Sequence, residues 1–239
     1  IRASRRGHIE VVRLLLTKVS KAHVNSGSRY DWTALEAACM GGHMTVVECL
    51  LQSGAQPNTR SRDGRTAFHA AAQGGNLELF QKLQIYAEEW DVATNDGYKP
   101  LDLAAGNGHA EMLKYLLDCG ADVGSVNNAE YSALHLATSE GHIAVVRLLV
   151  ESGANINLTN TLGSTPLHWA SEEGHSEIVA FFASVGAEVD KPNDDGWTPL
   201  HSATYDGDVE VVKILLSEGS RISSQTSDGE TPLHMAAMH

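Results

Sequence analysis

The chain has 239 residues, 42% of them hydrophobic and 20% charged, which is ordinary for a globular protein and sufficient for one large domain or two small ones. It contains neither an apolar run near the ~18 residues of a membrane span nor a charged-then-apolar signal segment, so we expect no membrane association. The net charge of −13 is uneven, with ten Lys and Arg against five Asp and Glu in residues 1–65 but seven against twenty-five in residues 66–239, and so acidic a body repels nucleic acid.

The first elements predicted along the chain are a glycine turn and a helix within RRGHIEVVRLLL, residues 5–16. From residue 33 onwards, segments that resemble TPLH recur with a period of 33. They begin at Thr33, Thr66, Lys99, Ser132, Thr165, Thr198 and Thr231. Each has an alanine five positions in, from Ala38 to Ala236, and all but the last have a glycine nine positions in, from Gly42 to Gly207. Such register indicates internal repeats.

Each period predicts two short helices. The Thr is suited to cap the first helix, and a Pro behind it, as at 166 and 199, fits the first helical position, where no N–H is needed. The glycine ends this helix in a left-handed conformation. A second helix carries apolar residues at i, i+1, i+4 and i+5, as in Val46 to Leu51, and an extended stretch then leads to an Asp-Gly turn.

These elements predict an all-α fold and one domain over residues 1–239. Its boundaries are a partial repeat at 1–29, full repeats at 30–62, 63–95, 96–128, 129–161, 162–194 and 195–227, and a partial repeat at 228–239. The chain starts and stops within repeats, so we expect an excerpt of a longer protein that frays after about Gly229.

The repeats resemble the ankyrin-repeat family, whose pattern is similar to DGxTPLHxAAxxGHxxVVxxLLxxGA. The match is close in DGWTPLHSATYDGDVEVVKILLSEG at 195–219 and extends over nearly the whole chain. The resemblance implies a solenoid of stacked helix-turn-helix units with hairpin loops. It also implies protein partners bound on the concave face.

The histidines at first suggest chemistry, because TPLHWASEEGHSEI at 165–178 places two of them around paired glutamates. The internal repeats argue otherwise. The fourth TPLH position alternates among His, Glu and Asp, and the position after the glycine alternates among His, Asn and Asp. A catalytic or ligand role does not tolerate that exchange, whereas capping of helix starts does. We therefore expect ten of the twelve histidines to be structural.

No other signal for chemistry stands out. The sequence lacks a phosphate-binding loop, an HExxH motif and a GxSxG motif. The cysteines, Cys39, Cys49 and Cys119, are odd in number and lack CxxC spacing, so neither a disulfide framework nor a zinc site is indicated. We expect no enzyme, no cofactor and no metal, and reduced thiols favour a cytoplasmic or nuclear location.

Candidate partner-binding residues follow from the family's contact positions, at the hairpin tips and just before the glycines. They are Trp32, Arg65, Tyr98, Tyr131, Glu140, Glu172, Glu173, Asp194, Asp195, Trp197, Tyr205 and Asp206. Tyr and Trp dominate the energetics of protein interfaces. The alternative is that each ring packs only on its neighbouring tip. We predict a groove of Tyr98, Tyr131, Trp197 and Tyr205 with an acidic rim, which takes a basic or mixed-charge peptide or helix.

Two functions remain open at this stage. One is a protein-interaction module or scaffold, expected to be a monomer; the other is a regulatory or sensing segment of a larger enzyme or receptor. Nucleic-acid binding through arginines near the start is disfavoured by the acidic remainder. The repeat at 63–95 departs from the pattern, with Ala87 in place of the closing glycine and Gln84 in place of an apolar residue. It is either a weak point, which we favour, or a local partner site.

Overall fold

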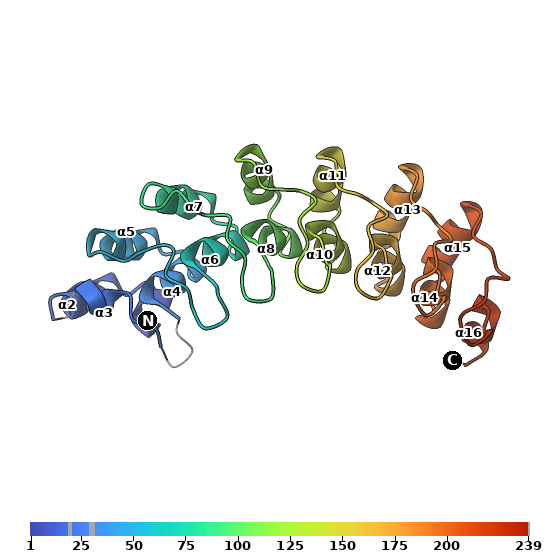
Figure 1. Cartoon of the computed structure of the whole chain (residues 1–239), viewed down its shortest axis with the longest axis horizontal. Coiled ribbons are helices and arrows are strands. Elements are labelled where there is room, and N and C mark those ends of the chain that lie inside the picture. Colours follow the sequence, from blue (N-terminus) through green and yellow to red (C-terminus); the bar gives the residue numbers. More distant parts are fainter. Residues whose placement is uncertain (19–20, 29–31, 239) are drawn as a thin grey trace. The chain divides into compact units, whose positions relative to one another are not determined.

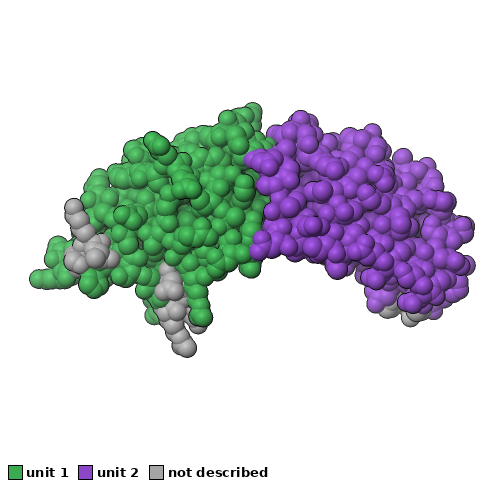
Figure 2. Space-filling view, in the orientation of Figure 1, with its two compact units in different colours: residues 1–121 green, residues 122–239 purple. Residues whose placement is uncertain are grey.

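The computed structural model describes residues 1–18, 21–28 and 32–238, which form two compact units, residues 1–121 and 122–239 (Figure 2). The predicted repeat boundary at 29 and 30, and the final residue His239, lie outside the described residues. Within the described part of the chain there is no β-strand, only an isolated bridge between Val126 and Ser132. The all-α prediction is therefore confirmed.

In the first unit, helices come in pairs from successive repeats. They are α1 (Arg2–Arg5), α2 (Ile9–Leu16), α3 (Lys21–Val24), α4 (Ala34–Met40), α5 (Met44–Gln52), α6 (Ala67–Gln73), α7 (Leu77–Gln84), α8 (Pro100–Gly106) and α9 (Ala110–Asp118). The first helices of the pairs, α4, α6 and α8, pack side by side in one row, with α5, α7 and α9 in a second row (Figure 1). Helix α3 lies in the stretch after α2 where the sequence predicts only a lengthened loop.

The second unit repeats this arrangement. Its helices are α10 (Ala133–Ser139), α11 (Ile143–Glu151), α12 (Pro166–Glu172), α13 (Ser176–Ser184), α14 (Pro199–Tyr205), α15 (Val209–Ser217) and α16 (Pro232–Met238). Helices α10, α12, α14 and α16 pack against one another in sequence, and α13 packs against α15 (Figure 1). In the described residues of both units, no helix combines the length and the apolar character that crossing a membrane requires.

The first helix of each repeat begins as the sequence predicts. Thr165 has extended backbone angles, and Pro166 follows it as the first helical residue. The helix ends where the glycine supplies a positive φ, which is 74° at Gly141. A Cβ on Gly141 would lie 2.8 Å from the ring of His175 in the next repeat. Glycine is thus required here both by backbone conformation and by the close approach of the neighbouring ring.

The second helices are capped differently from the prediction where histidine precedes them. The side chains of Asn76 and Asp208 accept hydrogen bonds from N–H groups of the helices they begin, as expected. The prediction is wrong for His43, His109 and His175, whose side chains cap nothing. The physical reason is side-chain length, because the imidazole extends beyond the first N–H groups of its own helix. Its Nε2 instead bonds a carbonyl oxygen of the preceding repeat, as His175 does with Ser139 at 3.0 Å.

The core of each unit is a layer of small and branched side chains between the two rows. The predicted alanines, such as Ala104 and Ala170, are fully buried, so the first helices of adjacent repeats approach closely. The second helices contribute larger residues, including Phe80 in the first unit and Phe182 in the second. Backbone hydrogen bonds also link adjacent hairpin tips within a unit, for example from the N–H of Asp194 to the carbonyl oxygen of Leu162.

The irregular repeat at 63–95 is packed by aromatic residues that the sequence pattern does not anticipate. Helix α7 ends at Gln84, and the hydroxyl of Tyr115 on α9 lies 2.6 Å from the Gln84 Oε1. Trp90 covers Phe80 in an edge-to-face contact with ring centroids 5.7 Å apart. The polar Gln84 thus has a specific partner in the next repeat.

Candidate partner-binding surface

The histidines of the TPLH segments are held in one arrangement. In Thr165 and His168, the Thr165 N–H donates to the His168 Nδ1 at 3.1 Å, and the Nε2–H donates to the carbonyl oxygen of Trp197 at 3.0 Å. Because the N–H is only a donor and the carbonyl only an acceptor, the ring is neutral with its proton on Nε2. His69, His135 and His201 make the same pair of bonds to their neighbours.

Burial also keeps these rings uncharged. Desolvation lowers the pKa of His69, His135 and His168 to about 4 and lowers that of His201. With both ring nitrogens engaged and no charge at neutral pH, these histidines serve helix capping and repeat stacking. No cluster of three or more metal-ligating side chains occurs in the part of the chain that the structure describes.

Two carboxylates take the histidine's place in the first unit. The Glu36 side chain accepts from the Thr33 N–H at 2.8 Å, and the Asp102 Oδ2 accepts from the Lys99 N–H at 2.8 Å. Burial raises the pKa of both, to about 7 for Asp102. The second oxygen of Asp102, Oδ1, has no hydrogen-bond partner among the described residues. An Asp at this position thus caps the helix start as His does, but leaves one buried carboxylate oxygen without a hydrogen bond in the described part of the chain.

The predicted aromatic residues of the second unit form two separate pairs. Trp197 and Tyr205, from the tip and first helix of one repeat, meet edge to face with centroids 5.6 Å apart. Tyr131 instead pairs with Trp169 on α12, also at 5.6 Å and edge to face. The fourth predicted ring, Tyr98, belongs to the first unit, where its carbonyl oxygen accepts from His69.

A cavity of about 360 Å³ opens beside the Trp197–Tyr205 pair. It lies between α12 and α14, and we call it the α12–α14 cavity. Its lining residues are Ser164, His168, Glu172, Asn193, Trp197, Ser202, Tyr205 and Asp206. Four of the twelve predicted site residues therefore meet here. Tyr205 is 42% exposed, so part of its ring lies at the protein surface beside this cavity.

Only some of the acidic residues that we predicted to surround the groove lie at this cavity. Glu172 and Asp206 line it, and Glu173 is near enough to act on Glu172. Desolvation, and then repulsion from Asp206 and Glu173, raise the pKa of Glu172. Glu140, Asp194 and Asp195 are exposed and line none of the cavities described here.

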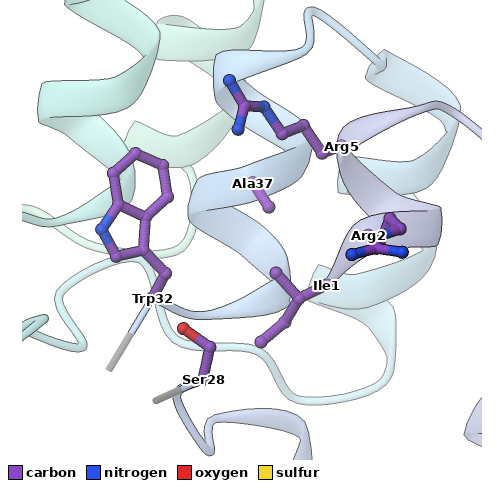
Figure 3. A pocket seen from close by; sticks show the side chains of 6 residues that line it. All are labelled: Ile1, Arg2, Arg5, Ser28, Trp32 and Ala37. Carbon is purple, nitrogen blue, oxygen red and sulfur yellow. The ribbon is translucent and has the colours of Figure 1, made fainter. Parts of the chain in front are cut away.

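The predicted residues of the first unit lie in a different setting. Trp32 lines a cavity of about 410 Å³ together with Ile1, Arg2 and Arg5 (Figure 3). Figure 3 shows the indole of Trp32 on one side of this cavity and Ile1 on the other. The Arg65 guanidinium hydrogen-bonds the side chain of Gln73 on α6, so it is engaged within its own repeat.

The charge of the two units differs. Residues 1–121 contain thirteen Lys and Arg and thirteen Asp and Glu, and residues 122–239 contain four and seventeen. The net charge of −13 is therefore carried by the second unit alone. Each of its four cations forms an ion pair on the surface: Arg147 with Glu177, Lys191 with Glu188, Lys213 with Glu210, and Arg221 with Asp190.

Sequence reasoning missed Trp169 and Asn193. The signal for Trp169 is its place one residue before the alanine of its repeat, where the other repeats carry smaller side chains such as Ala37, Ala70 and Ser202. Its Nε1 is buried and has no partner among the described residues. Asn193 accepts hydrogen bonds from the N–H groups of Asp195 and Trp197, and so sets the tip that carries Trp197.

Comparison with known proteins agrees with this architecture. A 57-residue segment of the chain is 42% identical to the ankyrin repeat and KH domain-containing protein mask-1 of Caenorhabditis elegans. The matched segment covers 24% of this chain and 2% of that protein. The chain thus matches a small fraction of the relative's length. The family model for ankyrin repeats, which describes three copies, matches residues 1–61, 47–127, 119–193 and 182–239. The chain belongs to the ankyrin-repeat family.

Proposed function

We propose that this chain is a protein-interaction module and that its second unit binds a basic or mixed-charge peptide or helix. Ankyrin repeats generally act in protein interactions and are typically non-catalytic. The observation that carries the proposal is the α12–α14 cavity, where Trp197 and Tyr205 stand beside Glu172 and Asp206. A half-buried indole and an exposed phenol, next to carboxylates that form no ion pair within residues 122–238, suit a partner that brings apolar surface and positive charge.

The remaining predicted residues extend this proposal. The other predicted acidic residues would steer a basic partner toward the second unit, because their charges add to its negative potential. They are Glu140, Glu173, Asp194 and Asp195. Tyr131 would contribute through its contact with Trp169. In the first unit, Trp32, Arg65 and Tyr98 would contact a separate part of the partner.

Other parts of the proposal concern the state of the chain. We propose one repeat domain over residues 1–239, because the 33-residue spacing continues from Gly108 to Gly141 across the division between the units. The proposed monomeric state is supported by a net charge far from zero. A cytoplasmic or nuclear location is supported by Cys39, Cys49 and Cys119, which form no disulfide with one another.

The test is a titration of fluorescent peptides of equal length, one rich in Lys and Arg with interspersed Leu and one with Asp and Glu in their place. We expect the basic peptide to bind more tightly and to weaken as salt is raised. Trp197→Ala and Tyr205→Ala should each weaken it at least about 5-fold, equivalent to ~1 kcal/mol. Phe181→Ala, on the second helix α13, is the matched control. Equal binding of both peptides, or no effect of either substitution, would overturn the proposal.

A further inference from the structure

The α12–α14 cavity has a more specific chemical character than an acidic surface. Two carboxylates face it from different repeats: Glu172 is the last residue of α12, and Asp206 follows the last residue of α14. Each of the unit's four Lys and Arg side chains is paired with another carboxylate. The cavity therefore concentrates negative charge that no cation within residues 122–238 neutralises.

The rings of the cavity are arranged to receive a cation as well. Trp197 and Tyr205 meet edge to face, with an interplanar angle of 65°. In an edge-to-face pair, one ring points its edge at the face of the other. The ring that presents its edge therefore keeps both of its own faces uncovered by its partner. An aromatic face attracts a cation through its quadrupole, and Trp gives the strongest interaction.

The same unit shows how this chain holds a guanidinium elsewhere. The Cζ of Arg147 lies 4.5 Å from the centre of the Phe181 ring, and an Arg147 nitrogen lies 3.6 Å from the Glu177 carboxylate. Both acceptors come from α13, one repeat further along the chain. The cavity between α12 and α14 offers the same two kinds of acceptor, a ring and a carboxylate, without a cation of its own.

Arginine fits these acceptors better than lysine. A guanidinium is planar, so it stacks on a ring while its forked N–H groups reach acceptors on more than one side. Carboxylates contributed by two repeats supply acceptors on separate sides. An ammonium group is a compact and strongly hydrated point charge, which loses more hydration and gains less from stacking. The volume of about 360 Å³ is at the small end of ligand sites, suited to one side chain rather than a folded element.

We propose that the α12–α14 cavity binds a single arginine side chain of the partner, stacked on the Trp197–Tyr205 pair and hydrogen-bonded to Glu172 and Asp206. This inference rests on the proposed protein-interaction function and assigns the residue type that the partner must present. Arginine here is an anchor, and the remaining acidic residues contribute steering rather than selection.

The test uses N-acetyl-arginine amide as the probe, followed by the indole N–H signals of the tryptophans in NMR spectra of the whole chain. Titration should shift the Trp197 indole signal saturably, assigned by its loss in Trp197→Phe. N-acetyl-lysine amide should bind at least about 3-fold more weakly, since it lacks the fork. N-acetyl-citrulline amide, of nearly the same shape but uncharged, should give no saturable shift.

Substitutions that leave packing alone then locate the site. Glu172→Gln and Asp206→Asn should each weaken the arginine probe about 3- to 10-fold, because each removes a charged acceptor. Glu151→Gln is the control, because it removes the same single negative charge from an exposed residue at the end of α11. It should leave affinity unchanged. Equal shifts by the arginine, lysine and citrulline probes, or indifference to both cavity substitutions, would overturn the arginine assignment.

The outcome separates this inference from the function on which it rests. If basic peptides bind in a Trp197-dependent way while the arginine probe leaves Trp197 unmoved, the interaction function stands and the arginine pocket is wrong. If the probe binds as expected but peptides do not, the cavity is a cation site and the peptide-binding function is wrong.

Discussion

The Nε2 of His168 lies 3.0 Å from the carbonyl oxygen of Trp197, twenty-nine residues further along the chain. One side chain therefore caps the N-terminus of α12 and also hydrogen-bonds the backbone of the next repeat's hairpin tip. That tip carries Trp197, whose ring belongs to the proposed binding surface. Helix capping, repeat stacking and the position of the site depend on the same neutral imidazole.

Removal of that imidazole should be costly. We expect His168→Ala to lower the free energy of unfolding by about 2–4 kcal/mol, because it leaves the Thr165 N–H and the Trp197 carbonyl without their partner. His234→Ala is the matched control. His234 makes the same capping bond to Thr231, but its Nε2 has no partner in the described residues, so we expect a loss below about 1 kcal/mol. Urea unfolding of both variants measures the difference, and equal losses would contradict the stacking role.

Acid should destabilise the fold in a defined pH range. His69, His135 and His168 have folded pKa values of about 4, and an unfolded histidine titrates near ~6.5. Between these values the unfolded chain binds more protons, so stability falls as the pH is lowered through this range and levels off below about 4. We expect each ring to contribute a loss of roughly 1–2 kcal/mol from pH 7 to pH 5. Urea unfolding at constant ionic strength measures it, and unchanged stability would contradict the neutral assignment.

Asp102 should oppose this trend. Its folded pKa of about 7 lies above the ordinary value, so its stabilisation is complete below about 4 and is lost as the pH rises through 7. Asp102→Asn keeps an acceptor for the Lys99 N–H and removes the buried charge. We expect it to raise the free energy of unfolding by about 1–3 kcal/mol at pH 8 and by much less at pH 5. A loss of stability at pH 8 would show that the charge is favourable.

One hairpin tip contains a residue ill suited to its backbone. Glu130 has φ of 60°, at the position where other tips have glycine, such as Gly163 at 72°. The left-handed conformation costs a non-glycine residue about 1 kcal/mol. We expect Glu130→Gly to raise the melting temperature by about 2–4 °C, measured by calorimetry. Glu130→Ala keeps the Cβ and removes the charge, so a similar rise in that control would assign the effect to charge rather than backbone.

The irregular repeat can be tested through a polar contact that its helix α7 makes with the next repeat. The Tyr115 hydroxyl bonds Gln84 across the α7–α9 packing. We expect Tyr115→Phe to cost about 1 kcal/mol and to speed hydrogen exchange in α7 more than in α5. Tyr86→Phe, which alters an exposed hydroxyl on the same repeat, is the control. The weak-point prediction fails if α7 in the unaltered chain is protected as well as its neighbours.

The sequence predicted the period, the helix pairs and the role of the TPLH histidines because these depend on local spacing and capping chemistry. It did not predict the hydrogen bonds that His175 and its equivalents make to the preceding repeat. The sequence shows that these residues precede a helix, but not that their rings reach a carbonyl oxygen in another repeat. Trp169 was missed for a related reason, since its contact with Tyr131 joins residues in different repeats. Among the candidate site residues, Trp197, Tyr205, Glu172 and Asp206 line one cavity, whereas the ring of Tyr131, which the prediction grouped with them, contacts Trp169 instead.

The hydrogen bonds between repeats also determine which changes of chain length the molecule tolerates. His135 donates to Ser164 and His168 to Trp197 at the same separation of twenty-nine residues. Excision of residues 162–194 would bring the Trp197 carbonyl to the place that Ser164 leaves, and His135 would find an equivalent acceptor. Duplication of the same stretch would preserve the match as well. An excision that removed only part of this stretch would change the separation and misalign donor and acceptor, so whole-repeat changes preserve a contact that partial ones break.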